Sequence, residues 1–162
     1  MTLPDDRILV LDYGSQFTKL IARRIREQRV YCEIQPPDRD PGWIREWSPS
    51  GVVLSGGPAS VYDDDVPGAD PELLEMGVPV LGICYGMQLL ARMAGGRVRG
   101  AEAREYGRAR MEVLESDRLF RGFEAGEEIT VWMSHGDDIE ALPEGWVPLG
   151  RTESVPVASL RA

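Results

Sequence analysis

Residues 78–96 read VPVLGICYGMQLLARMAGG, and this stretch decides the fold. The short apolar run Val78–Ile83 is typical of a buried strand, and the pattern from Tyr85 to Ala94 predicts a helix that ends at Gly95-Gly96. Only Cys84 separates the strand from the helix. A strand that runs directly into a helix is the repeating unit of parallel α/β sheets.

The sequence before this stretch repeats the alternation of strand and helix. Apolar residues at helical spacing between residues 14 and 28 include Phe17, Leu20, Ile21 and Ile25. After Gly96 the pattern changes to strands joined by turns, which is typical of a β excursion attached to a sheet. The predicted strands are 7–12, 30–34, 51–55, 78–83, 104–114, 128–133 and 146–151, and the predicted helices are 14–28, 43–47, 71–76 and 85–94.

These patterns predict an α/β fold with an open, mostly parallel, flavodoxin- or Rossmann-like sheet, flanking helices and a β excursion. Neither a repeat nor a linker interrupts the chain, and its 162 residues suffice to bury a core. We therefore expect one domain over residues 1–162.

Composition narrows the possible functions. The formal net charge of -9 argues against nucleic-acid binding and against an anionic membrane surface. No apolar run approaches the roughly 18 residues of a membrane span. Two distant cysteines and a single histidine make neither a disulfide framework nor a zinc site, so we expect no metal and a reducing, cytoplasmic setting. The arginines of residues 23–29 are expected on a solvated helix face.

Three glycine-containing loops follow predicted strands. They are Asp12–Ser15, Ser55–Pro58 and Cys84–Gly86. Sites in open α/β sheets form outside the carboxyl ends of the strands. The sequence therefore predicts that these loops meet at one edge of the sheet.

Cys84 sits in a glycine frame that resembles a nucleophile elbow. Gly82 and Gly86 lie two residues to either side and permit a tight strand-to-helix turn. The positive end of the following helix favours the thiolate, and the amide of Tyr85 lies where an oxyanion donor is needed. The alternative is a buried structural cysteine, as we expect for Cys32. The frame favours a nucleophile at Cys84.

Two neighbouring features have open interpretations. Gln88 lies one helical turn after Cys84 and can reach back to the same pocket, or it can be a solvated helix residue. The Ser55-Gly56-Gly57-Pro58 turn has free amides that can stabilise an oxyanion. A phosphate-binding loop is the alternative, but it requires a helix with a Lys or a Ser/Thr directly afterwards, whereas an acidic stretch follows here.

The only histidine, His135, lies in the segment Trp132–Asp137, which we expect to end a strand in a polar turn. One interpretation is a Cys–His dyad with Cys84. The other is a turn whose polar groups satisfy their own backbone. Spacing does not distinguish between them.

The motifs together resemble the triad-type (class I) glutamine amidotransferase domain of GMP synthases. The GICYGMQ motif alone is typical of class I amidotransferases, and the LDYGSQ opening and the pairing of EYGRA with VWMSHGD point to the GMP synthase branch. The matching segments are LDYGSQFT at 11–18, VVLSGGPASV at 52–61, GICYGMQ at 82–88, EYGRA at 105–109, VWMSHGD at 131–137 and TESVP at 152–156.

The resemblance implies a role for each candidate residue. Cys84 attacks the side-chain amide of L-glutamine, and the amides of Gly57 and Tyr85 hold the oxyanion. Gln88 and the turn formed by Ser134, His135, Gly136 and Asp137 contact the amino-acid end of the substrate. The ammonia passes to a synthetase (ATP pyrophosphatase) domain or subunit that uses ATP and Mg²⁺ to convert XMP to GMP. The resemblance implies no cofactor in the amidotransferase domain itself.

The resemblance also implies parts that residues 1–162 do not contain. Family members continue into a Phe-His-Pro-Glu motif whose His is the general base and whose Glu orients it, and into the synthetase and dimerisation regions. His135 belongs to the SHGD segment and is not expected to be the base. We expect little or no glutaminase activity from residues 1–162 alone. The alternatives are an amidotransferase for another acceptor and a non-catalytic glutamine-binding or regulatory module.

Overall fold

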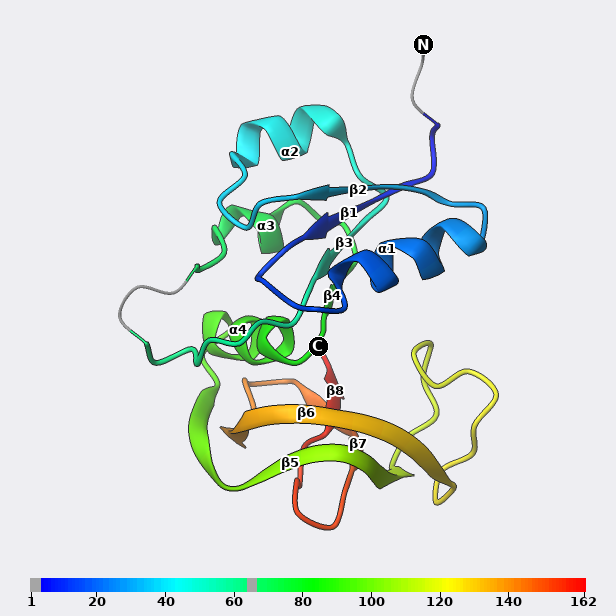
Figure 1. The fold of residues 1–162 in the computed structure, drawn as a ribbon, viewed down its shortest axis with the longest axis vertical. Helices are drawn as coiled ribbons and strands as arrows, with labels where there is room; N and C mark the ends of the chain where they lie inside the picture. Colours follow the sequence, from blue (N-terminus) through cyan, green and yellow to red (C-terminus); the bar gives the residue numbers. More distant parts are fainter. Residues whose placement is uncertain (1–3, 64–66) are drawn as a thin grey trace. The chain divides into compact units, whose positions relative to one another are not determined.

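The computed structural model describes residues 4–63 and 67–162, and the side chains of residues 101–106 and 135 lie outside that description. The chain forms two compact units, 1–93 and 94–162, which we describe separately (Figure 1). Unit 1 alternates strands and helices: β1 (Arg7–Leu11), α1 (Thr18–Glu27), β2 (Tyr31–Gln35), α2 (Pro41–Trp47), β3 (Gly51–Leu54), α3 (Glu72–Glu75), β4 (Val80–Gly82) and α4 (Tyr85–Met93).

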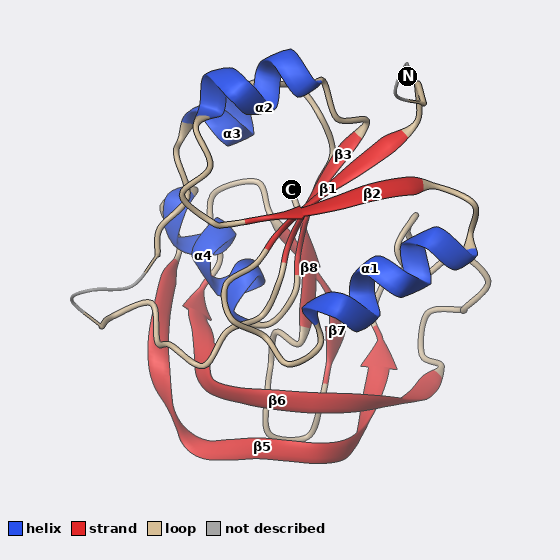
Figure 2. Cartoon of the chain, turned by 45° about the horizontal axis from the view of Figure 1, so that its top comes forward, coloured by secondary structure: helices blue, strands red, loops and turns tan. Residues whose placement is uncertain are grey.

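Unit 1 is built on a four-stranded parallel sheet with the order β2-β1-β3-β4. Leu11 pairs with Leu54, and Leu54 pairs with Gly82, so β1, β3 and β4 end side by side. The chain moves from β1 outward to β2 and then crosses back to β3. Helices α1 and α2 consequently lie on opposite faces of the sheet (Figure 2). This is the flavodoxin-like order, and it confirms the predicted fold class.

The centre of unit 1 is the apolar middle of β1 and β3. Leu9, Val10 and Leu54 are fully buried. The predicted apolar face of the first helix is wrong in part, because Phe17 and Leu20 are 49% and 44% exposed. Small residues of α1 are buried instead, namely Thr18 and Ala22.

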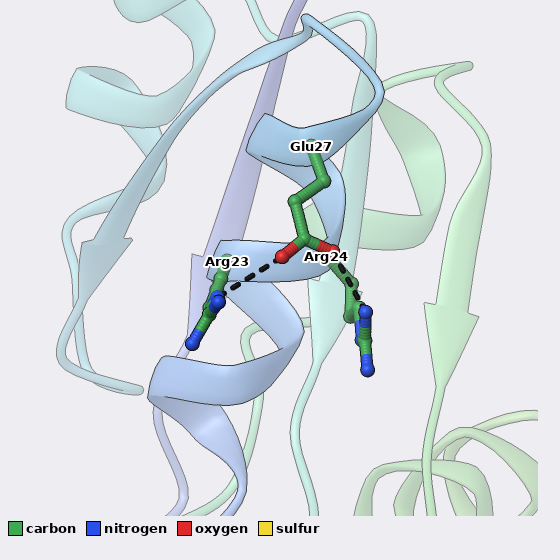
Figure 3. A network of polar contacts seen from close by, with 3 residues as sticks. All are labelled: Arg23, Arg24 and Glu27. Carbon is green, nitrogen blue, oxygen red and sulfur yellow. Dashed lines mark hydrogen bonds and ion pairs between the residues drawn. The ribbon is translucent and has the colours of Figure 1, made fainter.

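The arginine-rich side of α1 is solvated, as predicted. Arg23 and Arg24 both pair with Glu27, at 3.0 and 2.8 Å, and their side chains are more than 70% exposed (Figure 3). Arg26 differs, because its guanidinium donates to the carbonyl of Cys32 in β2. Exposed pairs of this kind contribute little to stability.

Unit 2 is an antiparallel sheet with the order β6-β5-β7-β8. Met111, Val113, Phe120 and Leu149 form its buried cluster. Its strands are β5 (Arg97–Val113), β6 (Glu128–Ala141), β7 (Val147–Arg151) and β8 (Ser159–Arg161). The predicted β excursion is confirmed, with longer strands than the sequence indicated.

The structure corrects the prediction that Trp132–Asp137 ends a strand in a polar turn. The segment lies inside β6, where His135 pairs with Glu105 and Asp137 pairs with Gly100. The register shifts between these pairs, so residues 101–104 of β5 bulge opposite Gly136. Pairing with a long partner strand extends β6 through a polar segment that lacks strand-forming side chains of its own.

Among the residues that the structure describes, none of the helices is both long enough and apolar enough to cross a lipid bilayer.

Candidate active site

Cys84 is the second of the two residues, Ile83 and Cys84, that lie between β4 and α4. Its φ of 50° lies in the left-handed region, which is uncommon for a residue with a side chain. The buried side chain of Tyr85 follows directly in α4. Left-handed geometry at a strand-to-helix turn is the backbone strain expected of a nucleophile elbow.

The two glycines around Cys84 are required by packing. A Cβ atom on Gly82 would lie 2.6 Å from the backbone of Gly86 and Met87. A Cβ atom on Gly86 would lie 2.4 Å from the carbonyl oxygen of Leu54. Any larger residue would force the backbone of β3, β4 or α4 to move, so these glycines let the elbow form against β3.

The start of α4 leaves one amide available beside the sulfur. Met87 and Gln88 both donate their amides to the carbonyl of Cys84, at 3.0 and 3.1 Å. The amide of Tyr85 donates to none of the residues that the structure describes. Amides in the first turn of a helix have no partner within the helix, and they are the usual donors for anions.

The loop after β3 lies against Cys84. A Cβ atom on Gly56 would lie 3.4 Å from the Cβ atom of Cys84, and one on Gly57 would lie 2.4 Å from the carbonyl oxygen of Tyr13. Gly56 therefore brings its backbone up to the nucleophile, and Gly57 packs directly on the loop after β1. Within the described part of the chain, the amide of Gly57 has no hydrogen-bond acceptor.

The loop after β1 is held by its own polar groups. The carboxylate of Asp12 accepts from the amide of Gly14 at 2.9 Å and from the hydroxyl of Thr18 at 2.6 Å. The side-chain oxygen of Ser15 lies 3.7 Å from the position that a Cβ atom of Gly56 would occupy. The three loops therefore meet at the carboxyl edge of the sheet, as predicted from the sequence.

The candidate residues are divided between the two units. Cys84, Gly57, Tyr85 and Gln88 belong to unit 1, and Ser134–Asp137 belongs to β6 of unit 2. Ser134 is exposed, while Gly136 and Asp137 are half-buried. The side chain of His135 lies outside the described part of the structure, so the expectation that His135 is not the general base stays a prediction.

Gln88 is buried, with 4% of its surface exposed. The alternative of a solvated helix residue is therefore wrong. Gln88 lies one turn after Cys84 on α4, and it has a polar partner within the protein. Its contact with substrate stays a prediction.

A family model for "Glutamine amidotransferase class-I" matches residues 9–161. The chain belongs to the class-I glutamine amidotransferase family. The match spans both compact units, and it confirms the resemblance that the motifs carry.

Curated relatives of this amidotransferase chain are named GMP synthase [glutamine-hydrolyzing]. The protein from Maridesulfovibrio salexigens is 56% identical over 156 residues, covering 96% of this chain and 30% of the relative. The protein from Heliobacterium modesticaldum is 48% identical over 160 residues, covering 99% of this chain and 31% of the relative. The chain thus spans about a third of the length of the curated relatives it matches.

Solved structures share the fold. A Thermoplasma acidophilum protein, provisionally described as one subunit of a GMP synthase, superposes with a TM-score of 0.78 and 29% identity. The match covers 96% of this chain and 77% of that chain. A glutamine amidotransferase from Thermotoga maritima superposes with a TM-score of 0.75 at 24% identity, covering 98% of this chain and 72% of that chain. The second likeness supports the fold alone.

The ionisation of Cys84 in the amidotransferase chain differs from the sequence-based expectation. Burial raises the pKa of the Cys84 thiol, so its net shift is opposite to the one expected from the helix end. Burial therefore favours the neutral thiol of Cys84 over the thiolate.

Two tyrosine side chains to which sequence reasoning gave no role lie at the elbow. The rings of Tyr13 and Tyr85 are 5.3 Å apart. Their hydroxyls donate to the carbonyls of Gly68 and Pro67, at 3.2 and 2.8 Å. Burial raises the pKa of both hydroxyls, which keeps them protonated as donors. The segment 67–68 is thereby joined to the loop after β1 and to the first residue of α4, which no sequence pattern indicated.

No group of three or more His, Cys, Asp or Glu side chains is arranged to hold a metal ion within the residues that the structure describes.

Proposed function

We propose that this chain is the glutamine-hydrolysing part of a GMP synthase, with Cys84 as its nucleophile. The single observation that carries the proposal is the left-handed elbow at Cys84, with the backbone of Gly56 packed against it. The high identity to curated GMP synthases favours this branch over amidotransferases that serve another acceptor.

The reaction begins at the sulfur. The Cys84 thiolate attacks the side-chain carbonyl carbon of glutamine, and the carbonyl oxygen becomes an oxyanion. The amides of Gly57 and Tyr85 donate to that oxyanion, because neither is used by another described residue. The intermediate collapses to a thioester and expels ammonia, which takes up the proton removed from the thiol. Water then hydrolyses the thioester, which yields glutamate and restores the thiol.

The proton transfers need a partner for Cys84. Because burial raises the pKa of the thiol, the neutral form predominates in the isolated elbow. The family resemblance assigns the base to the His of a Phe-His-Pro-Glu motif, which does not occur in residues 1–162. The proposed proton-transfer partner of Cys84 is therefore the His of this motif in the full-length protein.

Substrate binding and ammonia use complete the proposal. Gln88, Ser134, His135 and Asp137 contact the amino and carboxyl groups of glutamine. Ammonia passes to a synthetase domain, where ATP and Mg²⁺ activate XMP and ammonia displaces AMP to form GMP. The relatives are about three times as long as this chain, which leaves room for that domain.

The test is turnover of glutamine in the full-length protein. Cys84→Ser is expected to lower glutamate release about 10⁴-fold or more, as for the removal of a nucleophile that acts with its base as a unit. Cys32→Ala is the matched control. Cys32 is buried in β2, where its sulfur donates to the carbonyl of Ala22, and its loss should leave turnover unchanged.

Alkylation separates a poised nucleophile from a non-catalytic module. We expect glutamine to protect Cys84 from a glutamine-like electrophile, and Cys32 to remain unlabelled. Turnover that survives Cys84→Ser, or labelling of Cys84 that glutamine does not slow, would refute the proposal.

A further inference from the structure

A buried hydroxyl joins the two loops that flank Cys84. Ser55 directly follows β3 and is completely buried. Its amide donates to the carbonyl of Leu11 at 3.0 Å, and its side-chain oxygen accepts from the amide of Tyr13 at 2.9 Å. The hydroxyl proton of Ser55 is used in turn, because it is donated to the carbonyl of Gly56 at 2.9 Å.

The hydrogen bond to Gly56 fixes a whole peptide group. The carbonyl of Gly56 and the amide of Gly57 belong to the same planar unit, and in a trans peptide they point in opposite directions. No cis peptide bond occurs among the described residues. Holding the carbonyl toward Ser55 therefore aims the amide of Gly57 away from Ser55.

Glycines make this peptide easy to rotate. Gly56 and Gly57 both lack a side chain that would restrict their backbone torsions, and two consecutive glycines can adopt many orientations of the peptide between them. Their close packing, against Cys84 and against Tyr13, fixes the position of the loop but does not by itself select the direction of the peptide. A buried hydrogen bond to the carbonyl selects it.

We propose that Ser55 is a positioning residue, which holds the Gly56–Gly57 peptide with the amide of Gly57 ready to donate to the oxyanion formed at Cys84. The inference rests on the proposed glutamine hydrolysis. In this proposal, a side chain that does not touch the substrate sets the orientation of an oxyanion donor. Tyr13 takes part through its amide, which donates to the hydroxyl oxygen of Ser55, while the hydroxyl proton is donated to Gly56.

The test compares two reactions of the full-length protein at the same sulfur. Hydrolysis of glutamine builds an oxyanion, whereas alkylation by iodoacetamide displaces iodide at a methylene carbon and builds none. Ser55→Ala should lower kcat for glutamine about 10- to 100-fold, somewhat less than the roughly 10²–10³-fold cost of deleting an oxyanion donor outright. KM and the rate of alkylation of Cys84 should change less than about twofold, because the donor acts in the transition state.

Ser50 provides a matched control at the other end of β3. Its amide donates to the carbonyl of Arg7, and its hydroxyl accepts from the amide of Arg7 and donates to the carbonyl of Asp5. It thus repeats the pattern of Ser55 at the amino edge of the sheet, although Ser50 is exposed. Ser50→Ala should leave kcat and alkylation unchanged.

Each outcome decides the inference. A kcat that Ser55→Ala leaves intact overturns it, and so does an equal fall in kcat and in alkylation, which would indicate general damage to the elbow. If the parent protein shows no turnover that depends on Cys84, the proposed function fails whatever Ser55 does. If Ser55→Ala does not fold, the unsubstituted protein provides the test. The hydroxyl proton of Ser55 must then exchange slowly with water in proton NMR spectra, and fast exchange would refute the hydrogen bond to Gly56.

Discussion

Unit 1 presents Gly57 and Cys84 on loops that follow parallel strands, and Tyr85 and Gln88 at the start of α4, whereas unit 2 carries Ser134–Asp137 inside a paired antiparallel strand. The amides of Gly57 and Tyr85 take no part in a strand ladder. In β6 the backbone of Ser134 and His135 is engaged with β5. Unit 1 can therefore offer backbone donors to a reacting group, and unit 2 offers side chains. In the proposed mechanism, the backbone of unit 1 supplies the oxyanion donors, and side chains of unit 2 contact the substrate.

The largest expected effect tests how tightly the start of α4 packs against β3 in unit 1. Gly86→Ala should lower the free energy of unfolding by about 3 kcal/mol or more, because its Cβ atom would meet the backbone of Leu54 at 2.4 Å. Gly100→Ala in β5 is the control, since nothing lies within 4 Å of its added atom. Urea unfolding followed by circular dichroism measures both. Equal losses of unfolding free energy for Gly86→Ala and Gly100→Ala would contradict the expected difference in packing between the two units.

A second substitution asks whether the core of unit 2 supports the elbow. Leu149→Ala removes a fully buried side chain from the cluster of Met111, Val113 and Phe120, and it should cost about 2–5 kcal/mol. If the units behave as separate bodies, alkylation of Cys84 keeps its rate under native conditions. An altered rate of alkylation in a folded Leu149→Ala protein would show that the elbow depends on unit 2.

The smallest effect concerns the ionisation of Cys84. Because burial raises the folded pKa of this thiol, alkylation of the native chain should reach half its maximal rate at a higher pH than alkylation of the urea-unfolded chain. The raised pKa also stabilises the folded state at pH values below the pKa of the unfolded thiol. This contribution to the free energy of unfolding is lost as the pH rises through the pKa of the folded thiol. Cys84→Ala should abolish this pH-dependent loss of stability. A native midpoint below the unfolded one would show that the helix end outweighs desolvation.

Several features followed from local sequence because their causes are local. The alternation of apolar runs and helices predicted every element of unit 1, and the glycines around Cys84 predicted the elbow. The boundaries shifted by a few residues, as the helix of residues 14–28 is observed over Thr18–Glu27. Its buried face was missed, because residues with small side chains, Thr18 and Ala22, are buried against the sheet while Phe17 and Leu20 remain exposed.

Other features depend on residues distant in sequence, and for that reason the sequence did not reveal them. Strand β6 continues through Ser134–Asp137 because β5 pairs with it across a bulge. The pKa of Cys84 depends on how much protein surrounds the sulfur, which a helix-end argument does not include. The hydrogen bond from the amide of Tyr13 to the hydroxyl of Ser55 joins residues 42 positions apart.

Sequence alone was enough to identify the family and to predict the strand-to-helix elbow at Cys84 and the edge of the sheet where the loops meet, because strand periodicity and glycine placement depend on neighbouring residues. Tertiary structure decided which amides remain available, which way the Cys84 pKa moves and which side chain orients the Gly56–Gly57 peptide. Those properties arise from burial and from contacts between strands, so they exist only once the chain has folded.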